Sequence, residues 1–521
     1  MRSARLHVAP LAVDLPVGEV VRRLAGRARV TAWSGAWSCG ALVTCDPIRV
    51  APPAADPFAL LTDLPTVVPD PAHPHAVGGG WFGYLPFGGA ASLAYYRDVL
   101  RHDGERWWYE ALLTSAFDED MAGVRLAGLR AVLAAPAAVE EARLELLGEP
   151  DMTGHVVAVE RCVQAIRRGE IYQANIATHL DLRLHGSPHD AWARLVEERA
   201  PARAALVADP AGTAVSASPE LFLRRSGRQV RTAPIKGTRP RTGGAADVAE
   251  RARLAASAKD AAENVMIVDL MRNDLARVCA TGTVRVPGLL DVEPHAGVWH
   301  LVSTVTGELA PGRDDADLLA ATFPPGSVTG APKLRAIEVI DELEPRPRGL
   351  FTGAMGWASP LAGLELNVAI RTLEVAPDGR AVLAVGGGVT VDSTPVEEWA
   401  ECLTKAAPVL ATLGARVPVA AAPAHLARQA DGLFETLLAV DGRARRVGEH
   451  VRRLRASYLE CYGVPLTADV PADVAGAVGT APAAAGPGRV LRVRVDARPD
   501  EPDRVRVTVT PAGTSAVRGT P

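Results

Sequence analysis

Residues 256–279 read ASAKDAAENVMIVDLMRNDLARVC, and this stretch predicts a helix with one buried side. Its apolar residues recur at steps of three and four positions, which is the spacing of a buried helical stripe. The stripe consists of Val268, Met271, Leu275 and Val278. Lys259 and Glu263 stand four positions apart and therefore share a neighbouring face of the same helix.

A second charged helix is predicted over residues 395–411, PVEEWAECLTKAAPVLA. Pro395 suits the first helical position, where its missing N–H costs no hydrogen bond. Glu398, Glu401 and Lys405 follow at i, i+3 and i+7, which places two carboxylates and an ammonium along one side. Taken alone, the charges on both helices indicate ordinary ion pairs with Lys259 and Lys405.

Lysine is rare in this chain, with four lysines among 56 basic residues. They are Lys236, Lys259, Lys333 and Lys405. A chain that uses arginine almost everywhere else keeps lysine where arginine cannot do the same task, because arginine is not deprotonated in proteins. The four lysines are therefore candidates for functional positions.

Four segments around the two helices mix glycines, hydroxyl groups and single basic residues: APIKGTRPR, GSVTGAPK, LNVAIRT and VGGGVTVDST. Glycine runs let backbone N–H groups approach an anion closely. Neither the P-loop pattern nor the Rossmann glycine pattern occurs in strand and helix context. The segments thus indicate an anion site of another kind.

Together these motifs resemble the chorismate-utilising enzymes, the family of anthranilate, aminodeoxychorismate, isochorismate and salicylate synthases. The motifs are SPELF at 218–222, PIKGTRPR at 234–241, KDAAENVMIVDLMRNDLARVC at 259–279, HLVSTVTGEL at 300–309, GSVTGAPK at 326–333 and the Glu/Lys helix at 397–405. The resemblance is dense from about residue 150 to 412, and weaker in GGGWFGYLPFG at 78–88. It implies an α+β fold in which two antiparallel sheets face each other with helices outside.

The resemblance also implies a reaction, because position 236 differs among the family's members. Anthranilate and isochorismate synthases typically read PIAGT there, whereas aminodeoxychorismate synthase component I reads PIKGT, as this chain does. The implied reaction exchanges the 4-hydroxyl of chorismate for an amino group from ammonia. Lys236 is the candidate nucleophile, since an amine adding at C2 can expel that hydroxyl by allylic shift.

Further roles follow from the resemblance residue by residue. Glu220 matches the general acid, and His300 matches a histidine near the departing hydroxyl. The positions that match substrate-binding groups are Gly237, Thr238, Ser327, Arg371, Gly386 and Lys405. Phe351 stands where many relatives have tyrosine, so a hydroxyl donor is lost there. Lys333 is expected to cap or pair near the site, and Lys259 to neutralise acidic neighbours.

A magnesium ion (Mg²⁺) is the cofactor that the resemblance implies. Its ligands map to Glu263 and Glu401, with Glu398 as a nearby or water-mediated ligand. Magnesium prefers oxygen ligands and keeps several waters, so two protein carboxylates and the substrate would suffice.

The chain carries no glutaminase motif, so a separate glutamine amidotransferase subunit, or free ammonia, is the expected nitrogen source. The last part, DGLFETLLAVDGRARRVGEHVRRLRAS, resembles the start of class IV aminotransferases, and Arg453 matches their phosphate-binding arginine. Pyridoxal phosphate needs a lysine, and no lysine follows Lys405, so this unit is expected to lack lyase activity alone.

Composition limits the remaining possibilities. A net charge of −4 argues against nonspecific nucleic-acid binding. The absence of a long apolar segment or secretion signal predicts a cytoplasmic protein without membrane contact. The six cysteines lack metal-ligand spacing and are expected to be mostly free thiols.

The expected organisation has four parts: a region related to anthranilate synthase component I at 1–135, a catalytic region at 151–412, a linker at 413–430 and a small α+β unit at 431–521. In the first region RLAGLRAVLAAP, at 125–136, predicts strands and turns, and residues 135–150 predict a connector or surface helix. The competing interpretations are an anthranilate or isochorismate synthase, and a non-catalytic scaffold that recruits a glutaminase.

Overall fold

The structure is a computed structural model that describes residues 3–241, 243–295, 297–416, 433–462, 465–481, 490–498 and 501–511. The chain divides into two compact units, residues 1–418 and 419–521. Each unit is described by itself. The predicted linker at 413–430 lies outside the described residues from position 417 onward.

The first unit contains a sheet of 13 strands among the described residues. Its neighbours pair antiparallel except β1 and β5, which run parallel. The strands, in spatial order, are β10 (Arg143–Leu146), β11 (Gln173–His185), β23 (Arg380–Val389), β22 (Thr372–Val375), β13 (Gly212–Ser218), β12 (Arg203–Asp209), β2 (Thr31–Gly35), β3 (Ala41–Thr44), β8 (Asp98–His102), β9 (Trp107–Leu113), β1 (Ser3–Leu11) and β5 (Thr66–Val67), with β19 (Gly330–Ala331) beside β11.

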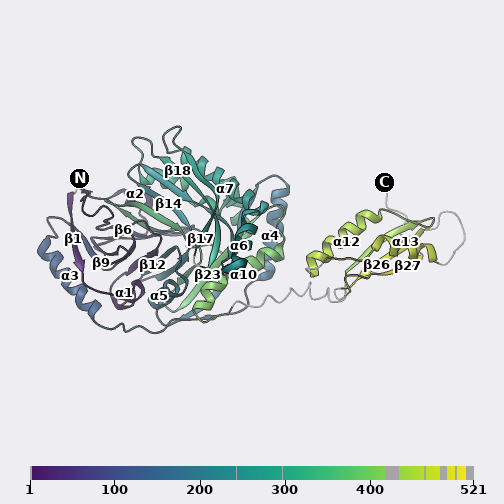
Figure 1. Cartoon of the computed structure of the whole chain (residues 1–521), viewed down its shortest axis with the longest axis horizontal. Helices are drawn as coiled ribbons and strands as arrows, with labels where there is room; N and C mark the ends of the chain where they lie inside the picture. The colour runs from purple at the N-terminus through teal and green to yellow at the C-terminus, as the bar shows by residue number, and fades with distance from the viewer. Residues whose placement is uncertain are drawn as a thin grey trace. The chain divides into compact units, whose positions relative to one another are not determined.

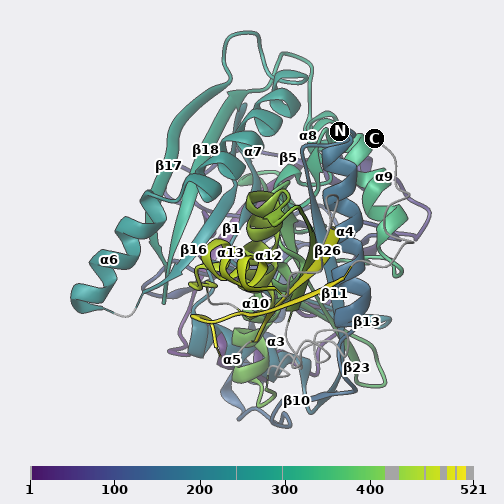
Figure 2. The ribbon, with the colours of Figure 1, turned by 90° about the vertical axis from the view of Figure 1, so that its right-hand side faces the viewer.

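A second sheet of ten described strands faces the first. Its strands, in spatial order, are β16 (Ile235–Pro240), β18 (Val298–Glu308), β15 (Gln229–Ala233), β14 (Leu221–Ser226), β21 (Gly363–Val368), β20 (Ala354–Ser359), β6 (Gly80–Leu85), β7 (Ser92–Tyr96) and β4 (Arg49–Val50), with β17 (Arg285–His295) beside β18. Figure 2 shows β17 and β18 as a long hairpin at one side of the unit.

Side chains from both sheets form one apolar core between them. Trp33 and Leu42 of the first sheet pack in one cluster with Phe82 and Trp357 of the second, and all four are buried. The rings of Trp33 and Phe82 lie 5.2 Å apart. This contact confirms the predicted α+β fold of two facing sheets.

Helices cover the outer faces of both sheets (Figure 1). Those packed on the first sheet are α1 (Val17–Leu24), α3 (Glu119–Ala134), α5 (Pro188–Arg199) and α10 (Pro395–Thr412), with α4 (Met152–Arg167) and α9 (Lys333–Leu343) against β11. Those packed on the second sheet are α2 (Pro57–Thr62), α7 (Ala258–Ala276) and α8 (Asp315–Thr322). The helix α6 (Gly244–Ala255) lies beside β16.

The two charged helices form close to their predicted bounds. In α7 the side chain of Ser257 caps the first turn by accepting a hydrogen bond from the N–H of Asp260, and the predicted apolar stripe is buried. In α10, Thr394 precedes Pro395 at the first helical position. The α10 helix packs against β23 and α4.

Two expectations for the first 150 residues are wrong. Residues 125–134 belong to the helix α3, because Leu126, Leu129 and Leu133 recur at helical spacing and pack on the first sheet. Residues 135–142 form a connector without helix or strand, which is one of the two predicted alternatives. Residues 143–146 form the strand β10, which pairs with β11, so the alternative of a surface helix is wrong. The region 1–135 contributes strands to both sheets, so it lies within the same unit as residues 151–412.

The described residues of the second unit form a four-stranded antiparallel sheet and two helices. Its described elements are β24 (Leu433–Val440), β25 (Arg443–Ala444), α12 (Val447–Tyr462), α13 (Val470–Thr480), β26 (Val490–Ala497) and β27 (Arg506–Pro511). Tyr458 of α12 and Val493 of β26 are buried in its core. The predicted aminotransferase relationship of this unit stays a prediction.

Candidate active site

The glycine run Gly386–Gly388 of β23 forms the floor of the candidate site. Six polar side-chain atoms lie within 4 Å of the points where Cβ atoms would stand at Gly387 and Gly388. The nearest is a Glu398 oxygen, 2.7 Å from the Gly387 point. A side chain at either position would therefore occupy space that the polar groups use. The strand is held in register by β11, which pairs Asn175 with Gly388 and Ala177 with Gly386.

Three groups from α10 stand over Gly387. Glu398 Oε2, Glu401 Oε1 and Lys405 Nζ lie 2.7, 3.6 and 3.8 Å from its Cβ point. Lys405 donates hydrogen bonds to the Gly386 carbonyl and pairs with Glu401, each at 2.7 Å. The helical spacing of i, i+3 and i+7 thus delivers all three groups to one place.

Three further polar groups stand over Gly388. Gln173 Nε2, Glu263 Oε2 and Lys236 Nζ lie 3.0, 3.1 and 3.3 Å from its Cβ point. They come from β11, α7 and β16, which are far apart in the sequence. The structure therefore brings Lys236 and Glu263 together, next to the group over Gly387.

The carboxyl groups of this cluster differ in the direction in which their pKa values are shifted. Burial raises the pKa values of Glu263 and Glu398 above the ordinary range, although nearby lysines oppose the shift. Burial acts in the same direction on Glu401, but the ammonium groups of Lys405, Lys259 and Lys236 outweigh it and hold the pKa of Glu401 low. Glu401 is thus the carboxylate best suited to stay ionised.

Glu220 stands at the junction of β13 and β14 and is only 4% exposed. Burial raises the pKa of its carboxyl to about 7, although a hydrogen bond from Ser327 and the charge of Lys236 both lower it. A carboxyl with this pKa is partly protonated at neutral pH and can donate a proton.

His300 and Thr238 face each other across neighbouring strands. Thr238 Oγ1 and His300 Nδ1 lie 2.9 Å apart. Burial lowers the pKa of His300 to about 3, and the charge of Arg371 and the nearby His295 add to the shift. His300 is therefore a neutral imidazole at physiological pH, which suits hydrogen bonding and not positive charge.

Arg371 follows β21 in a left-handed backbone conformation, with φ of 51°. Burial lowers the pKa of its guanidinium, while the charge of Glu220 opposes the shift. Within the described part of the chain, no hydrogen bond or salt bridge engages this guanidinium, so its donors are available to an anion. Gly237 also has a positive φ of 81°, and a Cβ there would stand 2.8 Å from Leu254 Cδ1.

The other two lysines have different surroundings. Lys333 donates to Asp274 at 2.5 Å and to the carbonyls of Thr322 and Pro324 at 2.8 and 3.0 Å. These contacts connect α7 to the segment before Ser327, which indicates that Lys333 stabilises the fold. Lys259 reaches across from α7 to Glu398 Oε1 at 3.6 Å.

Sequence reasoning missed three residues of this site. The side-chain oxygens of Gln173 and Asn175 are buried and have no hydrogen-bond partner, so both face a place that a ligand or water can fill. Arg348 donates to the carbonyls of Val328 and Asn175 and pairs with Glu344. Two sequence features could have indicated these residues: the amide side chains within the segment IYQANIA, and an arginine close to aromatic residues.

Phe351 is 4% exposed and packs with Ala177 of β11 and Ala384 of β23. The ring of Phe351 also lies 5.6 Å from the guanidinium carbon of Arg348. The apolar surface expected at this position is therefore present beside the glycine floor.

The carboxylates fit a magnesium ion that keeps part of its water shell. Carboxylate oxygens are the ligands that Mg²⁺ prefers, and Glu398 Oε2 is buried without a hydrogen-bond partner. In the described residues, no three His, Cys, Asp or Glu side chains lie close enough together to hold a metal unaided. Water or substrate oxygens would therefore complete the coordination.

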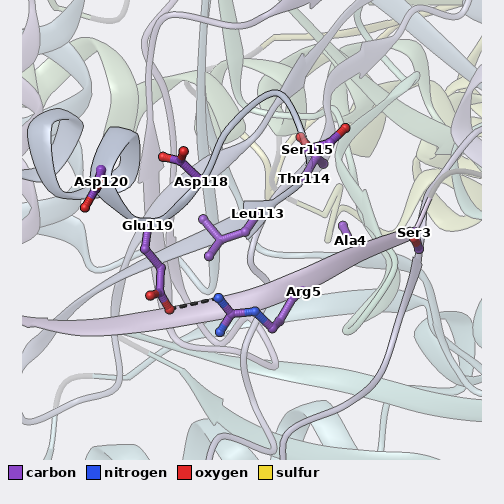
Figure 3. A pocket seen from close by; sticks show the side chains of 9 residues that line it. All are labelled: Ser3, Ala4, Arg5, Leu113, Thr114, Ser115, Asp118, Glu119 and Asp120. Carbon is purple, nitrogen blue, oxygen red and sulfur yellow. Dashed lines mark hydrogen bonds and ion pairs between the residues drawn. The ribbon is translucent and has the colours of Figure 1, made fainter.

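A surface pocket lies elsewhere, at the start of β1, the end of β9 and the start of α3 (Figure 3). Arg5 and Glu119 pair across it at 2.8 Å, and both side chains are largely exposed. In Figure 1 these elements stand at the opposite side of the unit from α10 and β23. The pocket therefore does not include the glycine floor.

The glycine floor and the polar groups around it lie within a segment that matches a known enzyme family. The chain belongs to the chorismate binding enzyme family, whose members match it over residues 84–411. Two kinds of relatives have nearly the same sequence identity to this chain. Aminodeoxychorismate synthase component 1 of Klebsiella aerogenes is 44% identical over 248 residues, which cover 47% of this chain and 54% of the relative.

Anthranilate synthase component 1 of Streptomyces coelicolor is 41% identical over 254 residues, which cover 48% of this chain and 50% of the relative. The chain thus spans about half the length of the curated relatives it matches. The menaquinone-specific isochorismate synthase of Escherichia coli has a similar structure, with a TM-score of 0.64 at 22% identity, covering 79% of this chain and 95% of that one. This likeness concerns the fold.

Other expectations concern the cysteines and the membrane. Cys39, Cys45, Cys162, Cys279 and Cys402 are buried free thiols, and the side chain of Cys461 lies outside the described residues. Among the described residues, no helix has both the length and the apolar character needed to cross a bilayer.

Proposed function

We propose that this chain is component I of an aminodeoxychorismate synthase, which converts chorismate and ammonia to 4-amino-4-deoxychorismate. The observation that carries the proposal is the position of Lys236. Its amine stands with Glu263 over Gly388, and its charge acts on the buried Glu220. A nucleophile and a proton donor thus share one site.

In the proposed reaction, Lys236 first loses one proton of its ammonium group to solvent. The neutral amine then adds to C2 of the chorismate ring, the double bond shifts and the C4–O bond breaks. Glu220 donates the proton that converts the departing hydroxide to water. Ammonia then adds at C4, the double bond shifts back and the bond between C2 and Lys236 breaks. The new ammonium group returns a proton to the Glu220 carboxylate, and Lys236 regains its proton from solvent, which restores the enzyme.

In this proposal, Arg371 and five further residues bind the substrate carboxylates. Arg371 takes the enolpyruvyl carboxylate, because its buried guanidinium can form two parallel hydrogen bonds. The remaining polar contacts come from Gly237, Thr238, Ser327, Gly386 and Lys405. His300, as a neutral imidazole next to Thr238, orients the departing hydroxyl.

Mg²⁺ is part of this proposal. When bound, it supplies positive charge that stabilises electron density on the ring carboxylate. Glu263 and Glu401 would hold it, with Glu398 as a nearby or water-mediated ligand.

The proposal extends to partners and organisation. Ammonia comes from a separate glutamine amidotransferase subunit or from solution, and the product supplies 4-aminobenzoate for folate or for a specialised metabolite. The protein works in the cytoplasm, without contact to nucleic acid or membrane. In this proposal, residues 151–412 form the catalytic region, residues 1–135 belong to the same compact unit, and residues 431–521 form an aminotransferase-like unit without a Schiff-base lysine.

Product analysis tests the proposal. The chain is incubated with chorismate, Mg²⁺ and ammonium, and 4-amino-4-deoxychorismate is the expected main product. Anthranilate or isochorismate as the main product would overturn the assignment. No ammonia-dependent loss of chorismate would favour the non-catalytic scaffold.

Intact-mass measurement tests the nucleophile. With chorismate and without ammonia, the wild-type chain should gain the mass of chorismate minus water. Lys236→Ala and the charge-preserving control Lys236→Arg should show no such adduct, because neither variant has an amine that can add to the ring. An adduct that persists in Lys236→Ala refutes the role of Lys236.

A further inference from the structure

Three of the four lysines lie beside the carboxylate cluster over Gly387 and Gly388, which consists of Glu263, Glu398 and Glu401. Their contacts differ in number and in length. Lys405 has two contacts at 2.7 Å, one with Glu401 and one with the Gly386 carbonyl. Lys236 stands over Gly388 within the site. Lys259 has its ion-pair contact with Glu398 at 3.6 Å, beyond hydrogen-bond length, and its side chain is 51% exposed.

The partner of Lys259 is a carboxylate that needs positive charge. The side chain of Glu398 is 2% exposed. Its Oε1 accepts a hydrogen bond from the Ser393 hydroxyl at 2.6 Å, whereas its Oε2 has no partner among the described residues. A buried carboxylate with one unsatisfied oxygen is costly unless a cation stands nearby.

The position of Lys259 in α7 is unfavourable by itself. Lys259 is in the first turn of the helix, where the backbone N–H groups favour negative charge and disfavour an ammonium. Asp260, the acidic residue of the same turn, already pairs with Arg239 at 3.2 Å. The attraction that explains an ammonium here therefore comes from across the site, from Glu398 on α10.

The surrounding charges agree with this explanation. Four carboxyl groups, those of Glu398, Glu263, Glu401 and Asp260, lie close enough to Lys259 to attract its ammonium. The cationic groups that face the same cluster are Lys236 and Lys405. The cluster is therefore neutralised by lysines when no metal ion is bound.

We propose that Lys259 is a displaceable counter-ion of the carboxylate cluster: its ammonium neutralises Glu398 when no divalent cation is bound and moves into solvent when one binds. The long, flexible stem and half-exposed position of Lys259 permit this movement, whereas the contacts of Lys405 oppose it. Lys259 thus weakens the affinity for the divalent cation and stabilises the metal-free protein. This inference rests on the magnesium site of the proposed function.

Calorimetric titration with MgCl₂ alone tests the proposal on the full chain without substrate. Lys259→Met keeps the aliphatic stem and removes the charge, so we expect it to bind Mg²⁺ at least about tenfold more tightly than wild type. Lys259→Gln should behave in the same way and serves as a second neutral variant. Lys259→Arg keeps the positive charge and should bind Mg²⁺ as wild type does.

Arg272→Met is the matched control, because Arg272 is on the same helix, is 53% exposed and pairs with Asp269 on the surface. It removes one positive charge at a distance from the cluster and should leave Mg²⁺ affinity unchanged. Thermal unfolding gives a second readout. Without Mg²⁺ the neutral variants should melt below wild type, and Mg²⁺ should raise their melting temperature by more than it raises that of wild type.

Equal or weaker Mg²⁺ binding by both neutral variants overturns the counter-ion role alone. An equal gain in Arg272→Met also overturns it, because the effect would then reflect net charge. Absence of Mg²⁺ binding by wild type and all variants overturns the magnesium site of the proposed function together with this inference.

Discussion

Glu220→Gln should make the protein more stable at alkaline pH while it removes activity. The folded-state pKa of Glu220 is about 7, against an ordinary value of 4.5. Because the folded value is the higher one, the stabilising contribution is fully present below pH 4.5 and is lost as the pH rises through 7. At about 1.4 kcal/mol for each pKa unit, ionised Glu220 costs the folded protein about 3 kcal/mol above pH 8.

Glutamine has nearly the same shape and no charge, so the variant avoids this cost. Its free energy of unfolding should exceed that of wild type by up to about 3 kcal/mol at pH 8.5 and match it near pH 4.5. Its rate of chorismate amination should fall by roughly 10² to 10⁴, the usual contribution of a general acid. The substitution should therefore raise stability and lower activity, because both depend on the proton of the Glu220 carboxyl.

Urea unfolding at pH 4.5, 7 and 8.5 measures the stability difference, and product formation at a fixed concentration of free ammonia measures activity. Glu105→Gln is the control, because the side chain of Glu105 is 82% exposed and should change neither quantity. A stability difference that does not grow with pH would refute the argument that Glu220 is buried as a neutral acid. Unchanged amination would refute its role as proton donor.

Two further predictions concern Lys333 and Arg371. Lys333→Met should lower the free energy of unfolding by about 3 kcal/mol in denaturant titrations, because it leaves Asp274 buried without its cation; an unchanged midpoint would contradict the structural setting of Lys333. Arg371→Lys should raise KM for chorismate roughly tenfold or more and change kcat less, because a lysine cannot form two parallel hydrogen bonds to a carboxylate; a fall in kcat at constant KM, in steady-state kinetics, would contradict a binding role.

Local sequence patterns predict the parts of this site that depend on one helix. The spacing of Glu398, Glu401 and Lys405 is enough to place them on one side of α10, since helix geometry fixes relative positions over two turns. The stripe of α7 likewise predicts its buried face. In both cases the relevant distances are short in sequence.

Other parts depend on pairings between distant strands, which no local pattern contains. Gln173 reaches Gly388 only because β11 and β23 pair in one register. Lys259 is four residues from Glu263, which indicates a pair along α7, yet its salt bridge is with Glu398 on another helix. The segment that forms α3 was predicted as strands and turns because its alternating small and apolar residues fit the period of a strand as well as that of a helix. Packing of its leucines on the first sheet favours the helix.

The pairing of β11 with β23 has a consequence for the synthesis of the chain. Residues 174–183 of β11 bond to residues 380–389, which the ribosome makes about two hundred residues later. At typical synthesis rates, this edge of β11 stays unpaired for roughly 10 to 40 seconds. During that interval the nascent chain exposes one unpaired edge of a 13-residue strand, so the chain is most vulnerable to aggregation before its glycine floor has been translated.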